Sequence, residues 1–516
     1  MQPSIQPDKA SNGRWYGSDS MLLPIAICLV LLIGFCSFLP YLEKYPEPYF
    51  DEAIFNNPAV RVHDGLSFAW PLATAAPYGN LVWAYHGPFY PRLQVLMMQL
   101  FGVSQFACRL PQYAAAFAAV GILCLLLYRL RLRWGALALA VFWLGDRSLV
   151  EALYGRMDGL ALLCLVLAFV ALVRALDTQS LWPVFWSGLW AATAVGFHPC
   201  TAPFAAIVTA VYLWRFSGRR LRVLCLLAVS SAIPALLVMA TVAPHFQEAV
   251  VQFLYHRRLL PALRGTLPGL VSVLGWSRYW CLALVCLSGA LAIPIVATLL
   301  KPGEDQSKAP SGSLFLAASL FSLAAFAVLA STAIFGALFP YYIIYLSVWP
   351  VVAVIAALDQ QAGRLWIRHA GLACLVLLAV AWLPSALWNF MRWREASLFA
   401  RGSLPKAFER QVRSVVPPGA EVKISPELFI VGHSLGPDAV RLPYETALEL
   451  PSSAWLALIG TDVRHLGGVE APGLRGRPIV YRGSLYPWIA KYSDSLIIFG
   501  PQPQSSLPSA ESGRGS

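Results

Sequence analysis

Apolar segments of about membrane-spanning length recur along this sequence between residues 21 and 389. A helix needs roughly 20 apolar residues to cross a bilayer, and in lipid it must satisfy every backbone N–H and C=O within itself. A chain made largely of such segments can therefore fold only as a bundle of membrane helices. About eleven spans are expected, at residues 21–41, 109–130, 134–148, 158–176, 181–197, 199–216, 221–243, 276–300, 314–333, 341–358 and 370–389.

The composition agrees with a membrane protein and argues against nucleic acid as a partner. Hydrophobic residues make up 58% of the 516 residues and charged residues 12%, whereas a soluble domain carries about 25% charged residues. The formal net charge is +12, and in a membrane protein a basic excess marks topology first and affinity for anionic lipid second. All ten cysteines lie in or beside apolar segments, so the hydrophilic tail has no disulfide framework.

The segment 88–101 decides the topology. It is apolar, but it is too short for a span, and Arg92 and Gln99 interrupt it. If it lies in the membrane interface instead, the basic loops all fall on one side of the bilayer: 129–133, 215–222, 301–308 and 364–369. The tendency of basic loops to stay in the cytoplasm favours this arrangement. Residues 1–20, which lack the pattern of a cleaved signal, are then a cytoplasmic tail.

The C-terminal part differs in composition from the transmembrane part, 21–389. Residues 390–500 are expected to form a small α/β domain outside the membrane, beginning with a helix over Glu395–Val416. Four β-like runs separated by Gly and Pro follow it: Glu421–Ser425, Trp455–Ile459, Pro478–Tyr481 and Ser495–Phe499. Residues 501–516, rich in Ser, Pro and Gly, are expected to be disordered. The predicted fold is an all-α polytopic membrane protein with a small C-terminal α/β extracytoplasmic domain.

The first outer loop, 42–108, contains an adjacent acid pair, Asp51 and Glu52, just beyond the first span. Acids at such a position cost desolvation energy. Partial burial raises the pKa of a carboxylate toward working pH, which suits a base that removes a proton from an acceptor hydroxyl. On a helix the two side chains point about 100° apart, so one could face a substrate while the other orients it. A helix N-terminus stabilised by acids is the structural alternative.

Two further groups on the outer side could serve the same chemistry. Asp158 opens a span, after Arg156, and is either a second active-site carboxylate or a partner of the helix dipole. Arg156 could bind a phosphate through two parallel hydrogen bonds. His256-Arg257-Arg258, with Arg264 nearby, could stabilise a leaving phosphate or could contact anionic lipid head groups.

Two other patterns carry less specific information. His63, Asp64, His86 and His245 could bind a divalent cation, but their spacing matches no compact ligand motif. No cofactor is predicted with certainty, and a metal requirement stays open. Gly432-His433-Ser434-Leu435-Gly436 matches the serine-hydrolase elbow. The domain is too short for a hydrolase sheet, and Gly436-Pro437 stops any following helix, so a turn is expected there.

Several motifs together resemble a known family. They are the acid pair, His86-Gly87-Pro88-Phe89-Tyr90, the run Leu100-Phe101-Gly102 with its later Arg109-Leu110-Pro111, and Arg156-Met157-Asp158-Gly159-Leu160. This order is similar to that of GT-C glycosyltransferases of the protein mannosyltransferase type. That group includes dolichyl-phosphate-mannose protein mannosyltransferases, aminoarabinose lipid A transferases and rhizobial lipopolysaccharide galacturonosyltransferases. The similarity covers about residues 20–220.

The resemblance implies a helical membrane fold, interfacial helices in the first outer loop, polyprenyl-phosphate-sugar donors and inversion at the anomeric carbon. It implies that Asp51 is the leading catalytic carboxylate, with Glu52 beside it and Asp158 at the second acidic position. It also implies substrate-binding roles for His86 and for the tyrosines of the late helix, Tyr341 and Tyr342. Here Gly87 replaces a proline of the family motif, and no arginine precedes Tyr341, so the phosphate role falls to Arg257, Arg258 or Arg264.

The sequence therefore predicts a glycosyltransferase of a bacterial inner membrane. It would move a sugar from a polyprenyl-phosphate donor to an envelope acceptor (lipid, glycan or protein) on the periplasmic side, by a single displacement with inversion. Two alternatives remain. A transporter or lipid flippase would need ionisable residues near mid-membrane and repeated halves, neither of which the sequence shows. A non-catalytic envelope scaffold would place no demand on Asp51.

Overall fold

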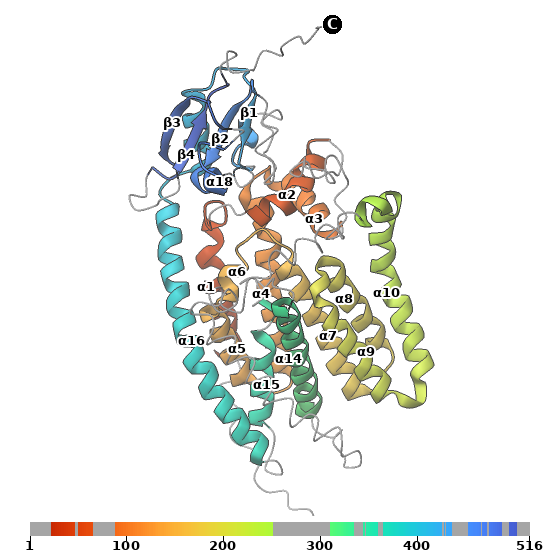
Figure 1. Ribbon diagram of the computed structural model, residues 1–516. Helices are drawn as coiled ribbons and strands as arrows, with labels where there is room; N and C mark the ends of the chain where they lie inside the picture. Colours follow the sequence, from red (N-terminus) through yellow and green to blue (C-terminus); the bar gives the residue numbers. More distant parts are fainter. Residues whose placement is uncertain are drawn as a thin grey trace, which may run out of the picture.

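The computed structural model describes most of the chain as a helical bundle with a small sheet at one end (Figure 1). The description covers residues 22–46, 50–65, 88–250, 310–334, 344–345, 347–359, 365–425, 428, 430–435, 452–465, 467–471, 474–487 and 495–502. We call the end of the bundle that carries the sheet the sheet end, and the other the far end.

The bundle is made of helices that overlap the expected apolar segments. They are α1 (Leu22–Phe38), α4 (Gln105–Arg129), α5 (Arg133–Gly145), α7 (Asp158–Thr178), α8 (Trp182–Phe197), α9 (Ala202–Arg215), α10 (Arg220–Val242), α14 (Pro310–Ile334), α15 (Val348–Asp359) and α16 (Leu365–Phe399). Short turns of helix join them: η1 (Leu39–Tyr41), α6 (Ser148–Glu151), η2 (Pro199–Thr201), η3 (Ser217–Arg219) and η4 (Ala243–His245).

Within the described ranges, five helices are long and apolar enough to cross a membrane: Leu22–Tyr41, Gln105–Arg129, Asp158–Thr178, Ser217–Val250 and Gly371–Phe399. Three shorter apolar helices accompany them, at Arg133–Gly145, Gly312–Val328 and Val348–Asp359. The expectation of a helical membrane protein is confirmed. The count of eleven stays a prediction, because the expected span 276–300 lies outside the described residues and α8 and α9 are short.

Helices α4 and α7 form the centre of the bundle, and their close approach depends on one glycine. Ser104 begins α4 by accepting a hydrogen bond from the N–H of Ala107 at 3.1 Å, a common N-cap arrangement. A Cβ at Gly159 would lie 2.4 Å from the carbonyl oxygen of Gln112. Only glycine lets the start of α7 pack this tightly against α4.

Two further helices, α2 (Phe50–His63) and α3 (Phe89–Phe101), lie between the bundle and the sheet (Figure 1). Helix α3 corresponds to the segment 88–101. At 1.5 Å per residue it is about 20 Å long, too short to span a bilayer. It buries Gln94 and Met98 and exposes Leu100 and Phe101, so one side faces the protein and the other presents apolar groups outward.

The C-terminal part contains a four-stranded sheet in the order β1-β2-β4-β3. The strands are β1 (Val422–Ile424), β2 (Trp455–Ile459), β3 (Ile479–Ser484) and β4 (Ser495–Phe499). Strands β1 and β2 run parallel, and the other pairs are antiparallel. Helices α17 (Leu404–Arg413) and α18 (Gly460–His465) and the short η9 (His433–Leu435) complete it. The expected small α/β region is therefore present.

The single helix expected over Glu395–Val416 is wrong. Helix α16 continues through Phe399, the chain turns at 400–403, and α17 begins at Leu404. Gly402 lies in this turn. Pro405 is in the first turn of α17, where a backbone N–H would have no partner within the helix, so its missing N–H costs nothing. The proposed domain boundary at residue 390 lies inside α16 and stays a prediction.

The sheet region contacts the bundle through side chains on both sides of this turn. The ring of Phe399 packs against Tyr45 and Tyr486, with centroid distances of 5.6 and 4.9 Å. Lys44 Nζ donates to the carbonyl of Ala400 at 2.9 Å. A second contact joins η9 to the end of α2, where His433 Nε2 lies 3.1 Å from Asp64 Oδ2.

Candidate active site

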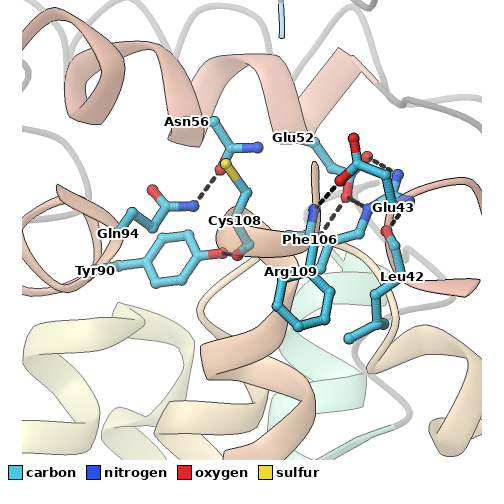
Figure 2. A network of polar contacts seen from close by, with 10 residues as sticks. Leu42, Glu43, Glu52, Asn56, Tyr90, Gln94, Phe106, Cys108 and Arg109 are labelled. Atoms are coloured by element: carbon cyan, nitrogen blue, oxygen red, sulfur yellow. Dashed lines mark hydrogen bonds and ion pairs between the residues drawn. The ribbon is translucent and has the colours of Figure 1, made fainter. Parts of the chain in front are cut away.

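Glu52, one of the three predicted site acids, is held by a buried arginine. Arg109 Nε and Nη2 donate to Glu52 Oε1 and Oε2 at 2.8 and 2.7 Å (Figure 2). The backbone N–H of Gly155 donates to the same carboxylate, and Arg109 Nη1 donates to the carbonyl of Leu42 at 3.0 Å. Arg109 is fully buried, and Glu52 is 1% exposed. Paired hydrogen bonds of this kind fix both distance and angle, so they fix the first turn of α2 over the start of α4.

Asp51 precedes Glu52 in that first turn of α2, and its side chain lies outside the described residues. Consecutive helix residues point about 100° apart. The role of Asp51 as the leading catalytic carboxylate stays a prediction.

Another predicted site acid, Asp158, begins α7 and contacts side chains from three parts of the chain. Arg156 Nε donates to Asp158 Oδ2 at 2.8 Å. The hydroxyl of Tyr345 donates to Asp158 Oδ1 at 2.5 Å, and His198 Nε2 lies 4.0 Å from the same oxygen. Three of these side chains, those of Arg156, Asp158 and His198, come from turns or helix starts at the sheet end. The arrangement brings together positions 156–158, 198 and 345.

The two acids belong to one connected network. Gly155, which donates to Glu52, is next to Arg156, and the Arg156 guanidinium carbon lies 5.0 Å from the ring centroid of Phe55 in α2. A Cβ at Gly155 would approach Glu52 Oε1 to 3.2 Å and Asn56 Nδ2 to 3.3 Å. The segment 155–158 therefore packs directly beneath α2, and it connects the carboxylate of Glu52 with that of Asp158.

His198 lies in the turn between α8 and η2 and is 4% exposed. Burial lowers the pKa of its imidazole to about 4, although the nearby Asp158 carboxylate acts in the opposite direction. The ring is therefore neutral at physiological pH. A neutral imidazole beside a carboxylate that also binds Arg156 can accept or donate a hydrogen bond without adding charge to the site.

Polar contacts also join α2 to α3 and to the start of α4. The amide of Gln94 donates to Asn56 Oδ1, and the hydroxyl of Tyr90 donates to the carbonyl of Cys108 at 3.1 Å (Figure 2). The N–H of Phe106 donates to Glu43 Oε2 at 2.7 Å. Burial raises the pKa of Glu43 above its ordinary value, against the effect of that hydrogen bond. These contacts hold α2 and α3 on the bundle.

The remaining predicted site residues fall outside the described part of the chain. They are His86, Arg257, Arg258, Arg264, Tyr341 and Tyr342, and their roles stay predictions. Arg156, predicted to bind phosphate, is 2% exposed and bound to Asp158 in this structure.

Of the residues considered as metal ligands, His86 lies outside the described residues, and His63 and His245 each lie beside one carboxylate. His63 Nδ1 lies 3.1 Å from Asp64 Oδ1, and Asp64 also meets His433. His245 Nδ1 lies 3.3 Å from Glu248 Oε1. Across the described ranges, no group of three or more His, Cys, Asp or Glu side chains is placed to hold a metal ion.

Reasoning from the sequence did not assign three residues of this network: Arg109, His198 and Tyr345. Arg109 had a signal, since a charged residue near the start of an apolar helix is costly unless it is paired. His198 stands between two expected spans, and its sequence neighbours do not indicate a partner. Tyr345 stands in an apolar stretch, and no pattern around it predicts a contact with residue 158.

The buried turn after α5 also contains a carboxyl group with a shifted pKa. Asp146 Oδ1 accepts the N–H of Ser148 at 2.8 Å, and its side chain is fully buried. This turn ends α5 at Gly145, three residues before the end of the expected span 134–148. Burial raises the pKa of Asp146 to about 6, against the lowering effect of the Ser148 hydrogen bonds.

We expect Asp146→Asn to stabilise the protein at neutral pH. Because folding raises this pKa, the folded state binds the proton more tightly, and wild-type stability falls as pH rises from about 4 to about 6. The cost at pH 7 is about 3 kcal/mol, from roughly two pKa units at 1.36 kcal/mol each. Asparagine keeps the Oδ1 acceptor without the charge. Thermal unfolding in detergent from pH 5 to 8 should show a higher Tm at pH 7.5 and a flatter pH profile.

Asp64→Asn is the matched control with the opposite sign. Burial alone would raise the pKa of Asp64, but hydrogen bonds with His63 and His433 outweigh it and the pKa is lowered. Asp64 therefore stabilises the folded protein at pH values above the ordinary pKa of aspartate, and this stabilisation is lost as the pH falls through the lowered pKa. A loss of Tm at neutral pH is expected. An Asp146→Asn profile that parallels the wild type would contradict the assignment.

The sequence of this region matches a known family. Residues 85–246, from just before α3 to just past α10, match the model of the dolichyl-phosphate-mannose-protein mannosyltransferase family. That range contains Arg109, Arg156, Asp158 and His198. No match is found among the curated proteins.

Among solved structures, the chain is similar to two crystal structures of ArnT from Cupriavidus metallidurans. The one bound to undecaprenyl phosphate is 14% identical and the apo one 12% identical, each with a TM-score of 0.48 and coverage of 93% of this chain and 98% of that chain. The central region of the chain is therefore similar to the dolichyl-phosphate-mannose-protein mannosyltransferase family, and it lies within a helical fold that has membrane-length helices.

Proposed function

We propose that the protein transfers a sugar from a polyprenyl-phosphate donor to an acceptor hydroxyl or amine at the sheet end of the bundle, on the periplasmic side of a bacterial inner membrane. The observation that carries the proposal is the clamp of Arg109 and Gly155 on Glu52. It fixes the start of α2 next to the Asp158 network, within a chain whose central region matches a family named for a dolichyl-phosphate-linked sugar.

In the proposed reaction, the side chain of Asp51 removes the proton from the acceptor. The acceptor atom forms a bond to the anomeric carbon as the bond from that carbon to the phosphate oxygen breaks. The electron pair leaves with the polyprenyl phosphate, and the configuration at the anomeric carbon inverts. Catalysis by a positioned base contributes about 100-fold to 10,000-fold in rate.

The neighbouring residues take supporting roles in this proposal. Glu52 acts as a positioning residue, because three hydrogen bonds occupy its carboxylate and it is almost fully buried. Asp158 holds Arg156 next to α2 through their ion pair. Arg156 and Arg258 are the proposed phosphate partners. Cations near the leaving oxygen would stabilise the charge that develops there.

The test is sugar transfer in membranes that contain the full chain. Labelled sugars would be supplied either as polyprenyl phosphates or as nucleotide diphosphates, with acceptor-rich envelope fractions. We expect transfer from the lipid-linked donors alone, and none in membranes that lack the chain. Equal transfer from nucleotide donors, or no transfer from any of a panel of lipid-linked hexoses and pentoses, would contradict the proposal.

A further inference from the structure

An apolar groove lies between α5, α15 and α16, away from the site described above. It has a volume of about 770 Å³. Leu137 and Val141 of α5, Val354 of α15, and Leu375 and Trp382 of α16 are among the side chains that line it. The helices that form it are the ones in the lower left of the bundle in Figure 1. An apolar groove of this size can take a hydrocarbon chain.

The groove opens at the far end of the bundle. Its mouth is formed by Arg131 and Arg133, where α4 turns into α5, and by Asp359 at the end of α15. Within α4, the distance along the helix from Arg109, in the Glu52 clamp, to Arg129 is about 30 Å at 1.5 Å per residue. This length matches the hydrocarbon core of a bilayer, so the mouth and the candidate active site lie at opposite membrane faces.

The mouth carries an excess of positive charge. Two arginines and one aspartate line it, and within the described residues neither arginine forms an ion pair. Arg133 lies over the ring of Tyr128, 5.3 Å from its centroid, and Trp134 beside it is 75% exposed. An exposed tryptophan next to basic residues is typical of the level of lipid head groups.

Arg131 also adopts a backbone conformation that favours glycine, with φ of 65°. A non-glycine residue in this region is strained, and such positions are often kept for the side chain they present. Here the conformation turns the chain so that Arg131 and Arg133 both reach the same opening.

We propose that this groove binds one acyl chain of an anionic phospholipid, whose phosphate is held by Arg131 and Arg133. The lipid belongs to the leaflet opposite the active site. The polyprenyl donor is a different molecule, since its phosphate must lie near Asp51 and Asp158, about one bilayer thickness away. The apolar walls take the chain, and the arginines select the charge of the head group.

The experiment measures lipid binding to the purified full-length protein by native mass spectrometry, with phosphatidylglycerol and phosphatidylcholine as probes. We expect tighter binding of phosphatidylglycerol. Each basic side chain near an anionic lipid contributes about five-fold in affinity. Arg131→Gln and Arg133→Gln should each raise the Kd for phosphatidylglycerol about five-fold, and the double variant about 25-fold.

Two more variants distinguish lipid binding inside the groove from nonspecific electrostatic attraction to a basic surface. Ala138 lines the groove and is exposed, so Ala138→Phe places an aromatic ring in the path of the acyl chain and should weaken phosphatidylglycerol binding with both arginines intact. Arg129 is exposed in the same turn but does not line the groove, and Arg129→Gln should change the Kd by less than about two-fold.

Three outcomes would overturn the proposal. They are equal binding of phosphatidylcholine, an Arg129→Gln effect as large as that of Arg131→Gln, and unchanged binding in Ala138→Phe. A competition arm identifies the source of the phosphate. If polyprenyl phosphate displaces phosphatidylglycerol at equal concentration, the groove belongs to the donor's tail and the assignment to a phospholipid fails. None of these results depends on whether sugar transfer is observed.

Discussion

Replacing Asp51 by asparagine is expected to lower sugar transfer at least about 100-fold, the smaller limit for losing a positioned general base. Asparagine has the same shape but cannot take the acceptor's proton. The loss should appear in kcat, because the donor's lipid and phosphate are held by other groups. The measurement is initial rate in membranes or detergent at matched amounts of folded protein, with a lipid-linked donor that the wild type uses.

Asp177→Asn is the matched control for this experiment. Asp177 is an exposed acid near the end of α7, at the other end of that helix from Asp158, and its replacement should leave the rate unchanged. If Asp51→Asn retains more than about one third of the wild-type rate, Asp51 only stabilises the N-terminus of α2, and its assignment as the base fails. Asp51→Glu should restore part of the rate if a carboxylate is what the reaction needs.

Replacing Arg109 by methionine is expected to destabilise the protein by about 3–5 kcal/mol, the range for removing one partner of a buried ion pair. The Glu52 carboxylate would lose the two charge-assisted hydrogen bonds that Arg109 donates at 2.8 and 2.7 Å, while remaining buried. Adding Glu52→Gln to Arg109→Met removes that charge and should recover much of the loss. Thermal unfolding of the two single variants and the double variant gives the coupling between the residues.

An exposed ion pair in the same chain is the control. Arg413 and Glu409 pair at 2.8 Å in α17, with side chains 61% and 35% exposed. Exposed helix pairs contribute about 0.3–0.5 kcal/mol, so Arg413→Met should hardly move the Tm. If Arg109→Met costs no more than Arg413→Met, the buried pair does not hold α2 in place.

The parts of the fold that follow from local composition could be predicted from the sequence. The apolar runs predicted most of the described bundle helices to within a few residues, but α15 begins seven residues after the expected start and α16 ends ten residues after the expected end. The runs Trp455–Ile459 and Ser495–Phe499 are strands with the expected bounds. The helix across Glu395–Val416 could not be placed, because whether a helix continues through Phe399 or restarts at Leu404 depends on the rings of Tyr45 and Tyr486, which are distant in sequence.

The candidate site shows the same limit. The sequence identified Glu52, Arg156 and Asp158 as chemically unusual for their surroundings, and the structure joins them in one network. It could not show that Glu52 is bound by Arg109, 57 positions away, or that Asp158 is bound by Tyr345, 187 positions away. Such contacts depend on how the helices pack, and no local pattern around residue 345 encodes them.

Helix α16 has a consequence for how the molecule unfolds. Its 35 residues form a helix of about 52 Å. It begins near the apolar groove and ends at Phe399 under the sheet. Phe399 packs against Tyr45 of the bundle and Tyr486 of the C-terminal part at once, and Lys44 binds the carbonyl of Ala400. The sheet therefore has no flexible tether of its own. The C-terminal part and the bundle should melt as one cooperative unit, and a fragment cut at residue 390 would expose an aromatic surface that the intact chain keeps dry.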